Sequence, residues 1–408
     1  MRVVSAADAA DAIAARLSPQ PAVRIPLSDA VGHVLAEDVI APIPLPPWTN
    51  AAMDGYAVRS VDVRGTSRDT PVVLTVVGTS QAGSFPVRSV QDGEAIRIFT
   101  GAPVPDGADS VIRQEDTNRE RDEVRVFDDR DAGSNVRRAG ADLERGAIAL
   151  AAGTVIGPRQ LGLLAALAAT HPMVHRAPRV GILATGDEVV SLDRIDDILA
   201  ARRLADVNGP ALEALVREAG GVPVPLGIAP DSPEALLGAI QAAQGIDLLI
   251  TAGGVSVGDH DHVRAVMATL GVVTAFDRVR MRPGGPTVFG NFPNGLPWLA
   301  LPGNPVSAMV TFELFGRSAI RVMRGERTPH RPRERAILTH AVPRDPILDQ
   351  YVRCVLERPA DGPPRATTTG PQGSGMLTSV ARAEALVLIP AGAGSVAEGA
   401  RVEMINLM

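Results

Sequence analysis

In the second half of the chain, short continuous apolar runs alternate with segments in which apolar residues recur at helical spacing. The runs are too short for helices and rich in β-branched residues, which is typical of buried strands in a parallel sheet. Between them, apolar residues such as Leu212 and Val216 recur at helical spacing, and Ser232-Pro233 marks a further helix start. This alternation predicts a doubly wound α/β domain with right-handed crossovers. The expected strands are 180–185, 246–251 and 297–301, and the expected helices begin near 208, 232, 263 and 306, the last reaching about 324.

The other segments follow different patterns. Residues 5–17 start with Ser5 as an N-cap and are rich in alanine, which predicts a helix. The proline-rich stretch 41–50 predicts a stiff connector. Residues 53–139 hold short strand-like runs divided by Gly, Pro and Asp, which predict a small barrel or sandwich. The helix expected at 159–169 is apolar on nearly every side, so we expect it to be buried, at a dimer contact for example.

These patterns divide the chain into four regions, because a second set of strand-like runs follows a Pro/Arg linker near residue 328. We expect an N-terminal helical and linker region, a β-rich domain, an α/β domain and a C-terminal β domain. The expected ranges, in that order, are 1–47 plus 140–172, 48–139, 173–327 and 328–408.

Composition narrows the class of protein. The 408 residues carry a net charge of −6, so no basic surface for nucleic acid is expected. Apolar runs stay shorter than a membrane span, and the start of the chain does not resemble a signal peptide. Cys354 is the single cysteine, which excludes disulfides and cysteine-based zinc sites. We therefore expect a cytoplasmic protein that binds neither nucleic acid nor membranes. All 40 basic residues are arginines, so an anion site has no lysine available.

The loop after the central strand carries the strongest chemical signal. Gly253 and Gly254 allow positive φ and close approach of the backbone, and Ser256, Asp259 and Asp261 follow them. In open α/β sheets, ligands bind beyond the carboxyl ends of the strands. A hydroxyl, exposed N–H groups and two carboxylates suit a phosphate bridged by a hard divalent cation. The alternative interpretation is a glycine-rich turn with solvated acids.

Two more loops leave the carboxyl ends of expected strands and should converge with the first. One contains Glu188, and the other places Asn304 as an N-cap before Pro305, which exposes a helix N-terminus to an anion. Three such junctions favour a phosphate-bearing ligand. Neither GxGxxG nor GxxxxGK[ST] occurs, which argues against an NAD-type site or a P-loop.

Several charged residues remain ambiguous from their spacing alone. Asp206 lies just before a helix start, where it either caps the helix or, with Asp259 or Asp261, holds Mg²⁺. His260 and His262 lack a third nearby ligand, so zinc is disfavoured. Arg282 is either an oxyanion ligand or a solvated arginine.

Ordered motifs along nearly the whole chain resemble the MoeA family, whose eukaryotic relatives include the E domain of gephyrin. The matching stretches are NAAMDGYA (50–57), TGAPVPDGAD (100–109), NVRRAGAD (135–142), ATGDE (184–188), TAGGVSVGDHD (251–261), MRPGGP (281–286), LPGNPVSA (301–308) and QGSGMLTS (372–379). The resemblance implies four subdomains, with the α/β domain of the molybdopterin-binding type. It also implies an elongated homodimer whose active site lies between the α/β domain of one protomer and the C-terminal and β-rich regions of the other.

The family's reaction gives the expected function. It exchanges the adenylyl group of adenylylated molybdopterin for molybdate, with Mg²⁺, and releases AMP and molybdenum cofactor. By this resemblance, a molybdopterin adenylyltransferase and molybdoenzyme acceptors are candidate partners. The alternative is a diverged paralogue that binds molybdopterin or partner proteins without efficient insertion, or that uses another oxyanion such as tungstate.

The resemblance also assigns residues by position within the motifs. Positions that match those important for activity are Asp54, Thr100, Asp142, Glu188, Asp206 and Asp261. Positions that match those around the oxyanion and substrate are Ser256, Arg282, Pro286, Ser307, Arg353 and Ser374, to which the loop pattern adds Gly253, Gly254 and Asn304. The candidate Mg²⁺ ligands are Asp206, Asp259 and Asp261.

One departure from the family pattern bears on the oxyanion. The usual turn reads KPGKP, and here it is Arg282-Pro283-Gly284-Gly285-Pro286. Arg282 keeps one cation, whereas Gly285 removes the second. A charge-assisted hydrogen bond contributes roughly 1.5–3 kcal/mol, so its loss predicts an oxyanion affinity ~10–100-fold lower.

Overall fold

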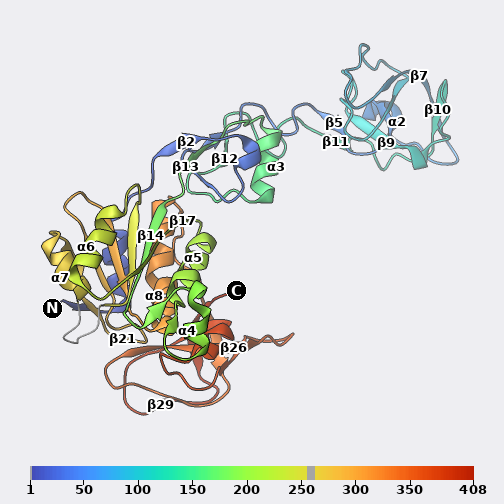
Figure 1. Cartoon of the computed structure of the whole chain (residues 1–408). Helices are drawn as coiled ribbons and strands as arrows, with labels where there is room; N and C mark the ends of the chain where they lie inside the picture. The colour runs from blue at the N-terminus through green and yellow to red at the C-terminus, as the bar shows by residue number, and fades with distance from the viewer. Residues whose placement is uncertain (1, 255–261) are drawn as a thin grey trace. The chain divides into compact units, whose positions relative to one another are not determined.

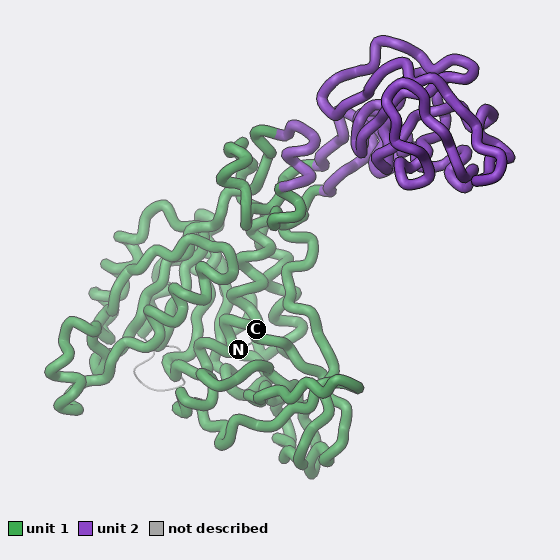
Figure 2. The backbone as a smooth tube through the Cα atoms, turned by 90° about the vertical axis from the view of Figure 1, so that its right-hand side faces the viewer, with its two compact units in different colours: residues 1–37, 152–161, 170–408 green, residues 38–151, 162–169 purple. Residues whose placement is uncertain are grey.

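The computed structural model describes residues 2–254 and 262–408, which form two compact units (Figures 1 and 2). Unit 1 comprises residues 1–37, 152–161 and 170–408, and unit 2 comprises residues 38–151 and 162–169. The four finer domain ranges expected above stay predictions. No helix within the described ranges is both long enough and apolar enough to cross a membrane.

A six-stranded sheet forms the centre of unit 1. The first four strands in its order are parallel; three of them were expected, and β17 was not. The last two pair antiparallel, so the sheet is mixed rather than wholly parallel. Because β14, β18 and β23 are adjacent and parallel, the loops that follow them leave the same edge. The strands in spatial order are β17 (Val222–Ala229), β14 (Arg179–Thr185), β18 (Leu248–Ala252), β23 (Pro297–Leu301), β22 (Val288–Asn291) and β19 (Val273–Phe276).

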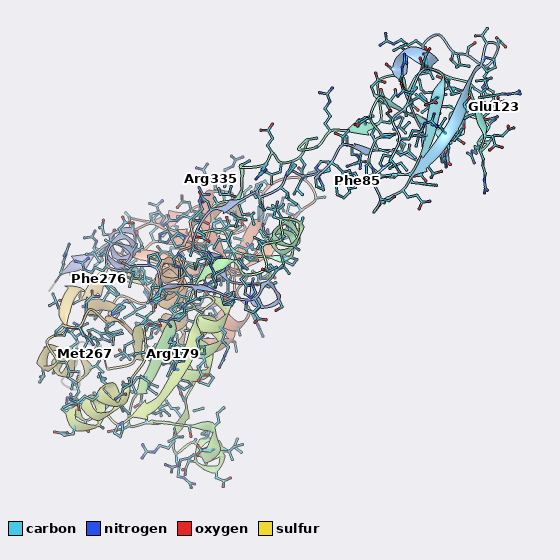
Figure 3. The ribbon with its side chains drawn as sticks, turned by 90° about the horizontal axis from the view of Figure 1, so that it is seen from above. Phe85, Glu123, Arg179, Met267, Phe276 and Arg335 are labelled. Atoms are coloured by element: carbon cyan, nitrogen blue, oxygen red, sulfur yellow. The ribbon has the colours of Figure 1, made fainter. Side chains whose placement is uncertain are left out.

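Helices cover both faces of this sheet and begin where the expected caps lie. Ser5 and Asp8 form a capping box, and the Ser232 hydroxyl accepts a hydrogen bond from the Ala235 N–H at 3.2 Å. One core contains Phe276 and the other contains Met267 (Figure 3). The helices are α1 (Ala6–Ala14), α5 (Asn208–Glu218), α6 (Pro233–Ala242), α7 (His262–Thr269), α8 (Pro305–Thr311) and α9 (Arg317–Met323).

The single helix expected from about 306 to 324 is interrupted. Residues Phe312–Gly316 form a π-helical turn, η4, between α8 and α9. The Thr311 hydroxyl donates to the Ser307 carbonyl oxygen at 2.7 Å, a back-bond that competes with the helical pattern just before this turn. Apolar spacing does not reveal such a local change in hydrogen bonding.

The C-terminal region of unit 1 forms a closed five-stranded barrel, as its strand-like sequence predicts. Closure occurs because β26 pairs with both β27 and β28. The short strand β21 (Met281–Arg282) adds to β26 in parallel and connects the barrel to the α/β domain. The barrel strands are β24 (Arg333–Leu338), β26 (Asp349–Glu357), β27 (Arg365–Thr368), β28 (Ala385–Ile389) and β30 (Arg401–Asn406), with the helix α10 (Leu377–Ala381) between β27 and β28.

Unit 2 contains a five-stranded sheet around an apolar core, so the prediction of a β-rich domain is confirmed. The barrel-like sheet has the spatial order β10 (Glu123–Val126), β7 (Val72–Ser80), β8 (Glu94–Ile98), β6 (Gly55–Val58) and β9 (Ser110–Arg113). The expected apolar helix is present as α3 (Pro158–Ala166), but within it only Leu164 is buried in this chain. The helix is therefore largely unburied within a single chain, and its burial at a dimer contact stays a prediction.

Short elements complete the two units. The two- and three-stranded pairings are β1 (Val3–Val4) with β20 (Arg278–Val279), β13 (Met173–His175) with β2 (Ala22–Arg24) and β3 (Val34–Leu35), β4 (Val39–Ile40) with β12 (Ile148–Leu150), β5 (Asn50–Ala51) with β11 (Val136–Arg137), β15 (Val189–Val190) with β16 (Leu204–Ala205), and β25 (Val342–Pro343) with β29 (Ser395–Val396). Brief helical turns are η1 (Leu27–Asp29), α2 (Ser60–Val63), η2 (Gln114–Asp116), η3 (Leu192–Arg194) and α4 (Ile195–Leu199).

Candidate active site

A cavity of about 620 Å³ lies in unit 1 where the parallel strands end. Loops after β14, β17, β18 and β23 line it, together with Gly375 and Leu377 from the C-terminal region of the same chain. The resemblance had assigned the C-terminal part of the site to the other protomer. The predicted site residues that line the cavity are Glu188, Asp206, Gly253, Gly254, Pro286 and Asn304.

Two of the predicted acids are held together by a short parallel ladder. The Leu204 N–H donates to the Glu188 carbonyl oxygen, and the Asp206 N–H donates to the Val190 carbonyl oxygen, both at 2.8 Å. Gly186 has φ +139°, and a Cβ there would lie 2.9 Å from the Glu188 carboxylate. The turn therefore keeps the Glu188 carboxylate close to the backbone at the cavity wall.

Asp206 both caps a helix and lines the cavity, so the two interpretations of its position are compatible. One carboxylate oxygen accepts a hydrogen bond from the Gly209 N–H at 2.9 Å in the first turn of α5. The Asn208 amide donates to the Gly303 carbonyl oxygen at 2.8 Å, which ties the start of α5 to the loop after β23. The helix start is thus fixed with a carboxylate at the cavity.

The glycines after β18 are required by close packing. Gly253 has φ +107°, and a Cβ there would lie 2.6 Å from Thr185 Oγ1. Gly254 has φ +64°, and a Cβ there would collide with Val263. Only glycine fits this approach between neighbouring loops. The three residues predicted further along the loop, Ser256, Asp259 and Asp261, lie outside the described residues.

Sequence reasoning missed Asp231, a further carboxylate of the cavity. It follows β17, and its backbone N–H donates to the Asp187 carboxylate at 3.0 Å. Burial, followed by the nearby charge of Asp187, raises the pKa of Asp231 above its ordinary value. Its position after a parallel strand could have indicated a site residue. The segment was instead interpreted only as a helix start, because Ser232 beside it is a clear N-cap.

The remaining predicted residues of unit 1 do not line this cavity. Arg282 is exposed on β21, and Ser307 is buried within α8. Arg353 is fully buried, where it donates to the Ser379 hydroxyl at 2.8 Å and to the Gly373 carbonyl oxygen at 3.1 Å. Ser374 is half-buried in the segment that Arg353 holds. Asn304 does line the cavity, but its side chain makes no capping hydrogen bond within the described part of the chain.

Unit 2 contains the other predicted acids. The Asp54 carboxylate accepts hydrogen bonds from the N–H and the hydroxyl of Thr100, each at 2.7 Å. These two bonds, the backbone one first, hold the pKa of Asp54 below its ordinary value. Asp142 is exposed, and its N–H donates to the Leu45 carbonyl oxygen at 2.9 Å.

The donors around the cavity suit a hard cation and its phosphate ligand. Thr185 Oγ1 and Asn208 Oδ1 are buried and have no hydrogen-bond partner among the residues described. Carboxylates and neutral oxygens are the ligands that Mg²⁺ prefers, usually one or two carboxylates together with phosphate. Within the described ranges no group of three His, Cys, Asp or Glu side chains is arranged to hold a metal alone. Two of the three candidate Mg²⁺ ligands are in the undescribed loop.

Comparisons with known proteins cover nearly the whole chain. Residues 4–168 match the MoeA N-terminal region (domain I and II), residues 181–322 match a probable molybdopterin binding domain, and residues 335–407 match the MoeA C-terminal region (domain IV). A solved structure of the molybdopterin biosynthesis moeA protein from Pyrococcus horikoshii OT3 is similar, with a TM-score of 0.85 at 27% identity, covering 99% of this chain and 100% of that one.

Curated relatives are similar over the same length. Molybdopterin molybdenumtransferase from Nostoc is 36% identical and covers 93% of this chain and 87% of its own length. Molybdopterin molybdenumtransferase 2 from Mycobacterium tuberculosis is also 36% identical, over 94% of this chain and 95% of its own length. Because the three matched regions follow the MoeA order and the fold agrees, the chain belongs to the MoeA family.

Proposed function

We propose that the chain is a molybdopterin molybdenumtransferase of molybdenum cofactor biosynthesis. It inserts molybdate into adenylylated molybdopterin and releases AMP, in a reaction that depends on Mg²⁺. The observation that carries this proposal is the cavity in which Glu188, Asp206 and Asp231 meet glycine-rich loops at the carboxyl edge of the sheet. Family membership, and relatives that are 36% identical, support the assignment.

The reaction breaks the phosphoanhydride that joins AMP to molybdopterin. It therefore needs charge neutralisation and positioning of the oxyanion more than it needs a protein nucleophile. Asp206, with Asp259 or Asp261, would hold Mg²⁺, which neutralises phosphate charge when bound. Glu188 is the proposed carboxylate that orients the reacting groups, and the loop of Gly253 and Gly254 allows phosphate oxygens to approach the backbone.

Motif position alone supports the other assignments, which stay proposals. The proposed substrate and oxyanion residues are Ser256, Arg282, Pro286, Asn304, Ser307, Arg353 and Ser374, and the proposed residues for activity in unit 2 are Asp54, Thr100 and Asp142. We also propose a cytoplasmic homodimer that receives its substrate from a molybdopterin adenylyltransferase and delivers cofactor to molybdoenzymes. The largely unburied apolar helix α3 supports the dimer.

The test is AMP release from adenylylated molybdopterin by purified protein with Mg²⁺, over a molybdate titration. Release should saturate with molybdate and yield active cofactor. Asp206→Asn and Glu188→Gln should each reduce the rate at least about tenfold. Glu213→Gln is the matched control, because Glu213 lies on α5 and pairs with Arg217 at 2.9 Å. Tight molybdopterin binding with no AMP release at any molybdate concentration would contradict the transferase.

Gly285 favours the second candidate, a diverged paralogue that binds molybdopterin species without efficient insertion or that uses tungstate. A titration with tungstate under the same conditions tests whether the chain prefers a different oxyanion. A lower half-saturation point for tungstate than for molybdate would support the change of oxyanion, and equal or higher values would contradict it.

A further inference from the structure

The Arg97 guanidinium of unit 2 lies between two aromatic rings. Its Cζ is 5.0 Å from the centroid of the Tyr56 ring and 5.0 Å from that of the Phe99 ring. Stacking of this kind restricts a planar cation, and an arginine in such a site is not replaced equivalently by lysine. Arg97 makes no ion pair with any carboxylate in the part of the chain that the structure describes. Its charge is therefore fixed in place by the two rings without a direct ion pair, although it still acts on the nearby Asp54 carboxylate.

Arg97 also joins the backbone beside Asp54 to the helical turn η2, which follows β9. One terminal nitrogen donates to the Gly55 carbonyl oxygen at 3.0 Å, and the other donates to the Gln114 side-chain oxygen at 2.6 Å. Gly55 is packed so tightly that a Cβ there would collide with the Ile112 carbonyl. The hydrogen bond therefore ties the Arg97 side chain to a backbone position that is itself held by close packing.

The two contacts of Arg97 bracket the Asp54–Thr100 pair. Gly55 directly follows Asp54, and Phe99 directly precedes Thr100. Asp54 accepts both hydrogen bonds of Thr100 at 2.7 Å, so the geometry of this pair depends on the register of the two segments. The Arg97 charge is also one of the causes that lower the pKa of Asp54.

We propose that Arg97 is a positioning residue that sets the Asp54–Thr100 pair in the geometry needed for the reaction. It does so through the Gly55 carbonyl oxygen and the Phe99 ring, without touching substrate. This inference rests on the proposed function, in which Asp54 and Thr100 serve the transferase reaction. Arg97 was not a candidate in the sequence, where it is one arginine inside a strand.

The first experiment compares Arg97→Gln and Arg97→Lys with Arg125→Gln, an exposed arginine on β10 of the same sheet. Arg97→Gln should lower kcat for AMP release roughly 10–100-fold with little change in KM, because a small misplacement of a reacting group has effects of this size. Arg97→Lys should recover part of the loss, since it restores charge but not the fork. Arg125→Gln should behave as wild type.

A second measurement does not depend on activity. The Thr100 amide signal in the NMR spectrum should follow ionisation of Asp54, and its titration midpoint should move upward in Arg97→Gln, because the variant removes a charge that lowers the pKa of Asp54. Asp54→Asn should abolish the titration. In an Asp54→Asn background, Arg97→Gln should cause no further loss of kcat.

The outcomes distinguish failure of the proposed role of Arg97 from failure of the proposed role of Asp54 in the reaction. An unchanged Thr100 amide together with a kcat equal to that of Arg125→Gln would overturn the role of Arg97. A shifted Thr100 midpoint, with Asp54→Asn still fully active, would support the coupling to Asp54 and instead contradict the proposed place of Asp54 in the reaction. If Arg97→Gln does not fold, Arg97→Lys carries the kinetic measurement and Arg97→Met, which also removes the charge, carries the titration.

Discussion

Replacing Gly285 by lysine should strengthen binding of molybdate. The usual turn of the family carries a lysine at this position, and Pro286 beside it lines the cavity. Gly285 is not among the glycines with positive φ, and a Cβ there would lie 3.3 Å from the Met281 carbonyl oxygen and 3.5 Å from that of Val279. A side chain at this position therefore requires the Met281 carbonyl oxygen to move by a few tenths of an ångström.

The magnitude follows from adding one cation beside a dianion. A charge-assisted hydrogen bond contributes about 1.5–3 kcal/mol, which corresponds to roughly 10–150-fold in affinity. We expect a molybdate half-saturation point at least about tenfold lower than that of the natural chain. Gly285→Met requires the same adjustment at the Met281 carbonyl oxygen, so a comparison of the two variants isolates the effect of the charge.

The assay is the molybdate titration of AMP release, with two matched controls. Gly285→Met adds a side chain of similar length without charge and should leave the half-point near its natural value. Gly284→Lys should damage the protein, because Gly284 has φ +102° and a Cβ there would collide with Thr311. Equal half-points for Gly285→Lys and Gly285→Met would refute the reasoning, since charge would then have no effect at this position.

Three other predictions concern single side chains. Asp231→Asn should slow AMP release but raise Tm at pH 7. Because the pKa of Asp231 is raised in the folded chain, its ionised carboxylate lowers the stability of the fold above that pKa. The Tm of the natural chain should therefore fall as the pH rises from the ordinary carboxyl pKa through the raised one, and the Tm of Asp231→Asn should not show this fall. Glu313→Gln removes one of the two carboxylates that pair with the buried Arg317 and leaves the more exposed Glu218, which should cost about 1.5–3 kcal/mol in urea unfolding. The exposed pair of Glu403 with Arg333 at 3.0 Å is the control, where Glu403→Gln should cost under about 1 kcal/mol. In a sedimentation experiment the natural chain should be a dimer, and Leu163→Arg on α3 should be a monomer. A natural chain that sediments as a monomer would contradict the proposed dimer.

The sheet edge was predictable because its signals are local and periodic. Strand-like runs before Gly253 and before Pro302 identify two neighbouring carboxyl ends, and parallel strands bring their following loops together. The caps at Ser5 and Ser232 were predictable for the same reason, since a hydroxyl reaches only the next few N–H groups. Both kinds of signal need no knowledge of distant residues.

Other features depend on packing that sequence patterns do not carry. The reversed direction of β22, which pairs antiparallel with both β23 and β19, leaves no mark in the apolar pattern, because that pattern is the same for either direction of a buried strand. Asp231 was not predicted because its neighbour Ser232 gives a clear capping signal. Only its raised pKa and its position in the cavity wall distinguish it from an ordinary acid beside a helix cap. The role of Arg97 could be recognised only from the positions of two rings, Tyr56 on β6 and Phe99 just after β8.

Arg353 shows the difference between matching a motif and contacting a ligand. Its side chain is buried on the face of β26 opposite the barrel core, and it holds Ser379 and the Gly373 carbonyl oxygen, on either side of the segment that brings Gly375 and Leu377 to the cavity. Burial lowers the pKa of Arg353, and it pairs with no carboxylate among the described residues, so two neutral oxygens solvate the charge while Nη1 has no partner there. The Arg353 cation therefore holds in place the segment that lines the cavity wall, and whether it also contacts substrate stays a proposal that rests on motif position.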